Sequence, residues 1–157
     1  MTLLAAWIRK YNNTEELVIA ADSRLRFGAA WDYCPKILML PRSDANLCFA
    51  GDTMYAYPIM LQIKNAIEMN DKARSRAMDI TDLRGHILRI IEDMRNSIYD
   101  FPAGLDEFDG TDFRFILAGY SWKFNEFKIW ILQYQKDINR FSFRTVSSHE
   151  KQTKGTK

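Results

Sequence analysis

The order of its predicted elements assigns this chain to the α+β class, with antiparallel sheets that carry helices on an outer face. Strand-like segments fill the first third of the sequence, two helical segments follow, and three further strand-like segments come after them. Strands grouped before and after a pair of helices do not give the alternation from which parallel sheets are built. We therefore expect sheets made largely of hairpins.

The N-terminal part of the chain predicts a hairpin followed by two shorter strands. Residues 2–8 are apolar and extended in character, residues 11–16 supply a turn, and residues 17–21 are apolar again. The shorter strands are expected at residues 36–40 and 46–50, on either side of a polar turn.

Two helices are expected in the middle of the chain. Asp52 or Thr53 can cap the first helix, and Pro58 fits this helix if it begins late or bends near its first turn. Asp79 or Thr81 starts the second helix, in which apolar residues recur at spacings of three and four.

The C-terminal part of the chain returns to strands. Residues 102–111 are rich in Gly, Asp and Pro and predict a loop, and strands are expected at 113–118, 127–133 and 141–145. Residues 147–157 are polar and basic, have nothing to pack, and are expected to form a frayed tail.

The composition indicates one globular domain, which we place at residues 1–146. A chain of 157 residues, 47% hydrophobic and 27% charged, is large enough for one core and too short for two. The net charge is only +2 and the basic residues are interspersed with acids, so no nucleic-acid partner is expected. Because there is no membrane-length apolar run and no signal peptide, we expect a cytoplasmic protein without a membrane partner.

Neither the cysteines nor the histidines predict a metal site. Cys34 and Cys48 lie in apolar surroundings without CxxC spacing, so we interpret them as small hydrophobic residues rather than disulfide or metal ligands. His86 falls in a predicted helix and His149 in the polar tail, and neither has neighbours with metal-ligand spacing. We expect no metal and no cofactor.

The N-terminus carries the most distinctive chemistry. Removal of Met1 would leave Thr2 with a hydroxyl and a free α-amine on one residue. A threonine hydroxyl needs a base to take its proton, and an α-amine with a pKa of about 7.7–8.0 is neutral often enough to act as that base. A Met-Thr start is common in proteins that make no use of it, so the support must come from other residues.

Four features, in order along the chain, resemble a proteasome β-type subunit, a member of the N-terminal nucleophile hydrolases. They are Thr2 at the start of the first strand, residues 18–24 at the end of the second, residues 35–37 at the start of a later strand, and residues 49–52 before a long helix. They are also similar to the simpler bacterial relative that works with a separate unfolding ATPase ring. The strand at 113–120 fits the family's next segment.

The resemblance implies that Thr2 is the nucleophile of a threonine peptidase. Asp22 and Lys36 are then its charged neighbours, and the backbone N–H of Gly51 belongs to the oxyanion hole. Arg24 is implied to support the loop of Asp22. A lysine near the hydroxyl favours its ionised form, and either the α-amine or Lys36 would accept the hydroxyl proton. An N–H aimed at the oxyanion can lower the barrier by about 3–4 kcal/mol. Taken singly, each residue also fits an ordinary role in a turn, a strand end or a helix start.

The same resemblance implies a four-layer αββα sandwich, a homo-oligomeric ring, a peptide or unfolded protein as substrate, and an ATPase unfoldase ring as a further partner. The family's domain continues where this sequence turns into the polar tail, so its last strands and helices are expected to be missing. The family's serine and aspartate near the threonine amine have no counterpart, and Ser121 is not a convincing substitute. Two alternatives stay open: a non-catalytic proteasome-like structural or assembly subunit, and an amidohydrolase for small amides.

Overall fold

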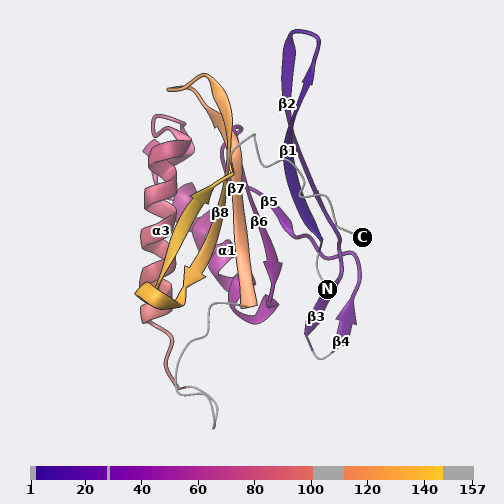
Figure 1. Ribbon diagram of the computed structural model, residues 1–157. Helices are drawn as coiled ribbons and strands as arrows, with labels where there is room; N and C mark the ends of the chain where they lie inside the picture. The colour runs from indigo at the N-terminus through magenta and orange to yellow at the C-terminus, as the bar shows by residue number, and fades with distance from the viewer. Residues whose placement is uncertain (1–2, 28, 101–111, 147–157) are drawn as a thin grey trace.

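The computed structural model describes residues 3–27, 29–100 and 112–146, with the side chains of residues 26 and 27 left out. These residues form three antiparallel sheets and three α-helices (Figure 1). The predicted α+β class with antiparallel sheets is confirmed.

Two small sheets come first in the chain. Strands β1 (Leu4–Tyr11) and β2 (Thr14–Ala21) form the predicted N-terminal hairpin, with Leu4 opposite Ala21. Strands β3 (Leu25–Phe27) and β4 (Ala29–Trp31) form a second hairpin. The sequence did not predict this second hairpin, because three-residue strands are too short to show an alternating pattern.

A five-stranded sheet holds the remaining strands in the order β5-β6-β7-β8-β9. The strands are β5 (Ile37–Met39), β6 (Ala45–Gly51), β7 (Phe113–Ser121), β8 (Glu126–Gln135) and β9 (Arg140–Thr145). A short 3-10 turn joins β8 to β9. Strands β6 and β7 pair directly although both long helices separate them in the sequence, so Gly51 lies opposite Phe113.

Helix α1 (Thr53–Glu68) follows β6 after one residue. Asp52 is its cap, since the Asp52 carboxylate accepts a hydrogen bond of 3.0 Å from the Met54 N–H. Pro58 lies inside the helix, so the helix does not begin late to avoid it.

A short helix α2 (Asp71–Arg74) and a long helix α3 (Ile80–Asn96) follow. Asp79 caps α3, since its carboxylate accepts a hydrogen bond of 2.9 Å from the Thr81 N–H. None of the helices in the described part of the chain is long and apolar enough to cross a membrane.

The core lies between the helices and the five-stranded sheet. Helices α1 and α3 cover one face of this sheet, and the β1–β2 hairpin lies on its other side and extends past its end (Figure 1). The largest fully buried side chains include Leu47, Phe49, Phe115, Ile63, Ile67, Leu83, Ile87 and Ile91. The described residues therefore form three layers: helices, sheet and hairpin.

Buried polar contacts join the helices to the turns at the end of the sheet away from Gly51. The fully buried Arg42 guanidinium pairs with Asp44 at 2.6 Å and donates to the Ala73 and Met78 carbonyls at 2.8 and 2.9 Å. Asp79, also fully buried, accepts a hydrogen bond of 3.0 Å from the Ser121 hydroxyl. This end of the molecule is therefore tied together by ionic and polar contacts.

Candidate functional site

The structure brings Asp22 and Lys36 together from two different sheets. Asp22 follows β2, Lys36 precedes β5, and the Lys36 Nζ lies 2.8 Å from the Asp22 Oδ2. The Lys36 side chain is only 1% exposed, whereas that of Asp22 is 30% exposed. A lysine this deeply buried requires a compensating charge, which Asp22 supplies.

Asp22 also fixes the start of the N-terminal strand. Its Oδ1 accepts a hydrogen bond of 2.8 Å from the Leu3 N–H, and its own N–H donates to the Leu3 carbonyl at 3.0 Å. Leu3 is opposite Asp22 in the register of the hairpin, so the Asp22 side chain accepts the bond that its backbone carbonyl would accept in a regular ladder. Thr2 lies outside the described residues, but Leu3, to which it is bonded, lies against Asp22.

The surroundings of Asp22 lower the pKa of its carboxyl group. The hydrogen bond from Lys36 is the largest cause. Hydrogen bonds from the backbone N–H groups of Leu3 and Arg24 and the positive charge of Lys36 act in the same direction, and partial burial opposes them. Asp22 is therefore a carboxylate at neutral pH.

Gly51 ends β6 in a conformation that favours glycine. Its φ is +109°, and a β-carbon there would lie 1.9 Å from the Asp112 carbonyl oxygen. Two residues earlier, the Phe49 N–H donates to the Lys36 carbonyl at 3.1 Å. Because N–H groups two residues apart on a strand point to the same edge, the Gly51 N–H is directed to the edge where Lys36 lies.

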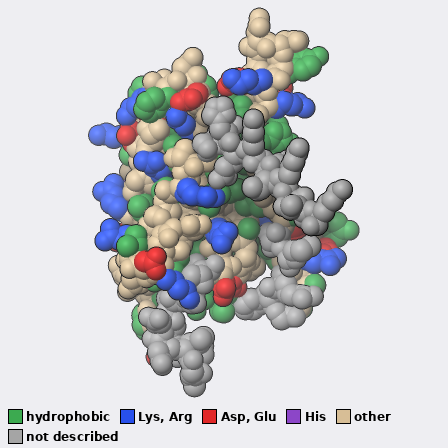
Figure 2. All heavy atoms as spheres, viewed as in Figure 1, with side chains coloured by type: hydrophobic (Ala, Val, Ile, Leu, Met, Phe, Trp, Pro, Cys, Tyr) green, Lys and Arg blue, Asp and Glu red, His purple; other side chains and the backbone are tan. Residues whose placement is uncertain are grey.

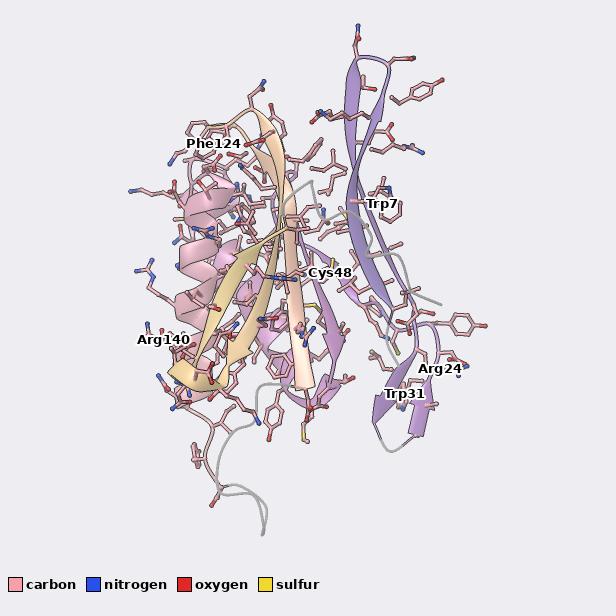
Figure 3. All side chains as sticks on the ribbon, in the orientation of Figure 1. Trp7, Arg24, Trp31, Cys48, Phe124 and Arg140 are labelled. Carbon is pink, nitrogen blue, oxygen red and sulfur yellow. The ribbon has the colours of Figure 1, made fainter. Side chains whose placement is uncertain are left out.

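Arg24 does not contact Asp22 through its side chain. Its guanidinium pairs with Asp32 at 2.6 Å, next to the β3–β4 hairpin (Figure 3). The contribution of Arg24 to Asp22 comes from its backbone N–H. Sequence reasoning missed Asp32, for which the only signal was an acid eight residues after an arginine with a glycine between them.

The other candidate residues lie away from this site or carry no reactive group. Cys34 and Cys48 are both free, and burial raises the pKa of the Cys48 thiol to about 12, so this thiol is not a nucleophile. Burial and the charge of Arg89 lower the pKa of His86, and His149 lies outside the described residues. Ser121 is bound to Asp79 at the other end of the sheet.

No metal site is found among the residues that the structure describes. On the face drawn in Figure 2, lysine and arginine side chains are spread among neutral, apolar and acidic ones. The candidate site therefore consists of the ion pair between Asp22 and Lys36, the N–H of Gly51, and Leu3, the first described residue.

Comparisons with known proteins identify no family. No protein-family model matches the sequence, and a search of curated proteins finds no match. Among the solved structures that match is one described as the Anbu (Gly-1) mutant from Hyphomicrobium sp. strain MC1. The sequence identity is 17%, the TM-score is 0.46, and the match covers 85% of this chain and 57% of that chain. This chain therefore spans less than two thirds of the length of that structure.

Proposed function

We propose that this chain is a subunit of a proteasome-like threonine peptidase, with Thr2 as the nucleophile after removal of Met1. The observation that carries the proposal is the ion pair between Asp22 and the buried Lys36, held directly against Leu3. Because Leu3 is bonded to Thr2, the proposal puts the Thr2 hydroxyl near the positive charge of Lys36. A positive charge there favours the ionised hydroxyl.

The proposed reaction is an acyl transfer in two steps. The Thr2 Oγ attacks the peptide carbonyl while the α-amine takes the hydroxyl proton, and the Gly51 N–H donates to the developing oxyanion. The α-amine then passes the proton to the leaving amine, and water hydrolyses the ester to release the acid and restore Thr2. We assign Lys36 to electrostatic stabilisation rather than proton transfer, because it is paired with a carboxylate.

The sequence resemblance supports the wider parts of the proposal. They are a peptide or unfolded protein as substrate, a homo-oligomeric ring, an ATPase unfoldase ring as partner, and a four-layer αββα sandwich. The antiparallel sheets and the helices of the described residues support this architecture.

The test combines the intact mass of the purified protein with hydrolysis of fluorogenic peptides. We expect Met1 to be absent, and peptide hydrolysis to be lost in Thr2→Ala and Lys36→Met. Lys128→Met is the matched control, since Lys128 is ion-paired on β8, and it should keep its activity. Circular dichroism spectra of all variants show whether each one is folded.

Retained Met1, or undiminished hydrolysis by Thr2→Ala, would contradict the mechanism. A folded oligomer without turnover on any peptide would instead favour the non-catalytic structural or assembly subunit. Turnover of small amides but not of peptides would favour the amidohydrolase.

A further inference from the structure

Strand β9 forms one edge of the five-stranded sheet, and in the described part of the chain its only neighbouring strand is β8. Directly after β9, the Val146 N–H donates to the Ile129 carbonyl of β8 at 3.2 Å. Successive N–H groups along a strand point to opposite sides, so the N–H groups of Phe143 and Thr145 point away from β8. The carbonyl groups of these two residues point the same way.

The start of β9 shows the same direction independently. The Phe141 N–H, two residues before that of Phe143, donates to the Glu92 carboxylate of α3. Glu92 also pairs with Arg95 at 2.9 Å, so its negative charge is compensated. A side chain therefore occupies the first outward N–H of β9, whereas Phe143 and Thr145 have no strand beside them among the described residues.

The two faces of β9 differ in chemistry. Phe141 and Phe143 belong to the face that packs on the core, and Phe143 is only partly buried. Arg140, at the start of β9 (Figure 3), and Arg144 alternate with them and are exposed on the other face. Arginine pairs with carboxylates through two parallel hydrogen bonds, and opposite charges across a ladder stabilise it. A strand that suits both faces therefore alternates acidic with apolar residues.

A second copy of the chain does not suit this edge. Strand β9 contains two arginines and no acidic residue. Pairing it with β9 of a copy would bring two arginines from each chain into one short ladder, and like charges there are destabilising. The charge of the edge therefore opposes self-pairing and favours an acidic partner.

We propose that the outer edge of β9 binds an extended acidic segment of a partner protein, which adds one strand to the five-stranded sheet. The backbone of the segment pairs with the outward N–H and carbonyl groups of Phe143 and Thr145, as in other cases of strand addition. Its carboxylates lie on the face of Arg140, and its apolar side chains lie on the face of Phe143. A contact of this size is at the small end of the interface range, so the binding is weak. The proposal does not depend on the peptidase activity.

Fluorescence anisotropy of a labelled peptide tests the role of charge. The probe has about seven residues, in which glutamate alternates with valine. Arg140→Glu should raise the dissociation constant about tenfold or more, because it replaces an attractive charge by a repulsive one. Arg9→Glu is the matched control, since it makes the same change in net charge at an exposed position of the β1–β2 hairpin, and it should bind like the wild type.

Thr145→Pro tests the added strand. Thr145 is exposed and its N–H points outward, so proline removes a donor to the peptide without removing one from the β8 ladder. This variant should also raise the dissociation constant about tenfold or more, whereas Thr145→Val keeps the N–H and should bind like the wild type. Hydrogen exchange gives a direct measurement, since the amides of Phe143 and Thr145 should exchange more slowly when the peptide is bound.

A second peptide separates strand addition from simple charge attraction. It carries the same glutamates with proline in place of valine, so it cannot form a regular ladder, and it should bind much more weakly than the probe. Equal binding of the two peptides would overturn the proposal. So would a probe that does not bind the wild type, or one whose binding is unchanged in Arg140→Glu or in Thr145→Pro.

Discussion

At the scale of single residues, the buried Lys36 ammonium is paired with the partly exposed carboxylate of Asp22. The Lys36 side chain is 1% exposed, and the Asp22 carboxylate lies 2.8 Å away. Removing one member of a buried pair is costly because the other charge stays behind without compensation. The proposed chemistry and the stability of the fold therefore involve the same pair of side chains.

Replacing Asp22 by Asn should show this dependence. Asn keeps an oxygen that can accept from the Leu3 N–H and removes only the negative charge. We expect Asp22→Asn to lower the free energy of unfolding by about 1–3 kcal/mol, less than the roughly 3–5 kcal/mol for a fully buried pair because water screens Asp22. Urea unfolding measures the change.

The double variant Asp22→Asn/Lys36→Met is the matched control for that experiment. It removes the positive charge of Lys36 as well as the negative charge of Asp22, so it should be more stable than Asp22→Asn alone. A double variant that is less stable than the single one would show that the charge of Lys36 is not the source of the loss.

At the scale of elements, the long segments were predictable, whereas of the short ones only β5 was predicted. The N-terminal hairpin, the two long helices and the later strands all show a clear apolar period. The β3–β4 hairpin has no such period, so the sequence could not show that Arg24 pairs with Asp32 across it. Likewise, only the folded sheet brings β6 beside β7 and sets Phe113 opposite Gly51.

The catalytic roles of the candidate site residues stay a prediction, and their hydrogen bonds could be seen only in the structure. Family resemblance pointed to Asp22, Lys36 and Gly51, and the ion pair between the first two is present in the structure. The hydrogen bond from Leu3 to the Asp22 side chain could not be foreseen, because it depends on where the β1–β2 ladder ends. The same holds for the backbone contribution of Arg24.

The stability that comes from the contact between α3 and the β7–β8 turn should fall in acid. Burial acts to raise the pKa of Asp79, but hydrogen bonds from Thr81, Lys123 and Ser121 outweigh it and lower the pKa to about 2. A lowered carboxyl pKa adds stability above the unfolded value of 3.8, and this stability is lost as the pH falls toward 2. The contribution is on the order of 2 kcal/mol.

The variant Asp79→Asn checks this expectation. It keeps a side chain that can cap α3 and removes the titrating group, so the free energy of unfolding should change less between pH 4 and pH 2 than in the wild type. Asp82→Asn, at an exposed position on the same helix, is the control. A wild-type pH profile in Asp79→Asn would contradict the assignment.

At the scale of the whole molecule, stability should be distributed unevenly between the layers. The helix layer and the five-stranded sheet share the buried core, whereas the outer half of the β1–β2 hairpin is exposed on both strands. Its charged side chains pair across the strands, as Arg9 does with Glu16. Exposed pairs of this kind add little stability.

Amide hydrogen exchange should reveal this difference. We expect the amides of β6 and β7 to exchange only through global unfolding, and those near the tip of the β1–β2 hairpin to exchange through local opening several orders of magnitude faster. Exchange at one common rate in both regions would show that the hairpin unfolds together with the core.

The Asp22 carboxylate, which accepts the Leu3 hydrogen bond in place of a backbone carbonyl, also fixes the point from which the chain runs to its N-terminal amine. Among the described residues, the first hydrogen bonds of the hairpin are those of Leu3, the residue after Thr2. One additional residue at the N-terminus leaves every rung of the ladder unchanged, yet it shifts the amine by about 3.3 Å of extended chain. A distance of that size exceeds a hydrogen bond, so in the proposed mechanism an accurate cut after Met1 matters as much as the identity of the threonine.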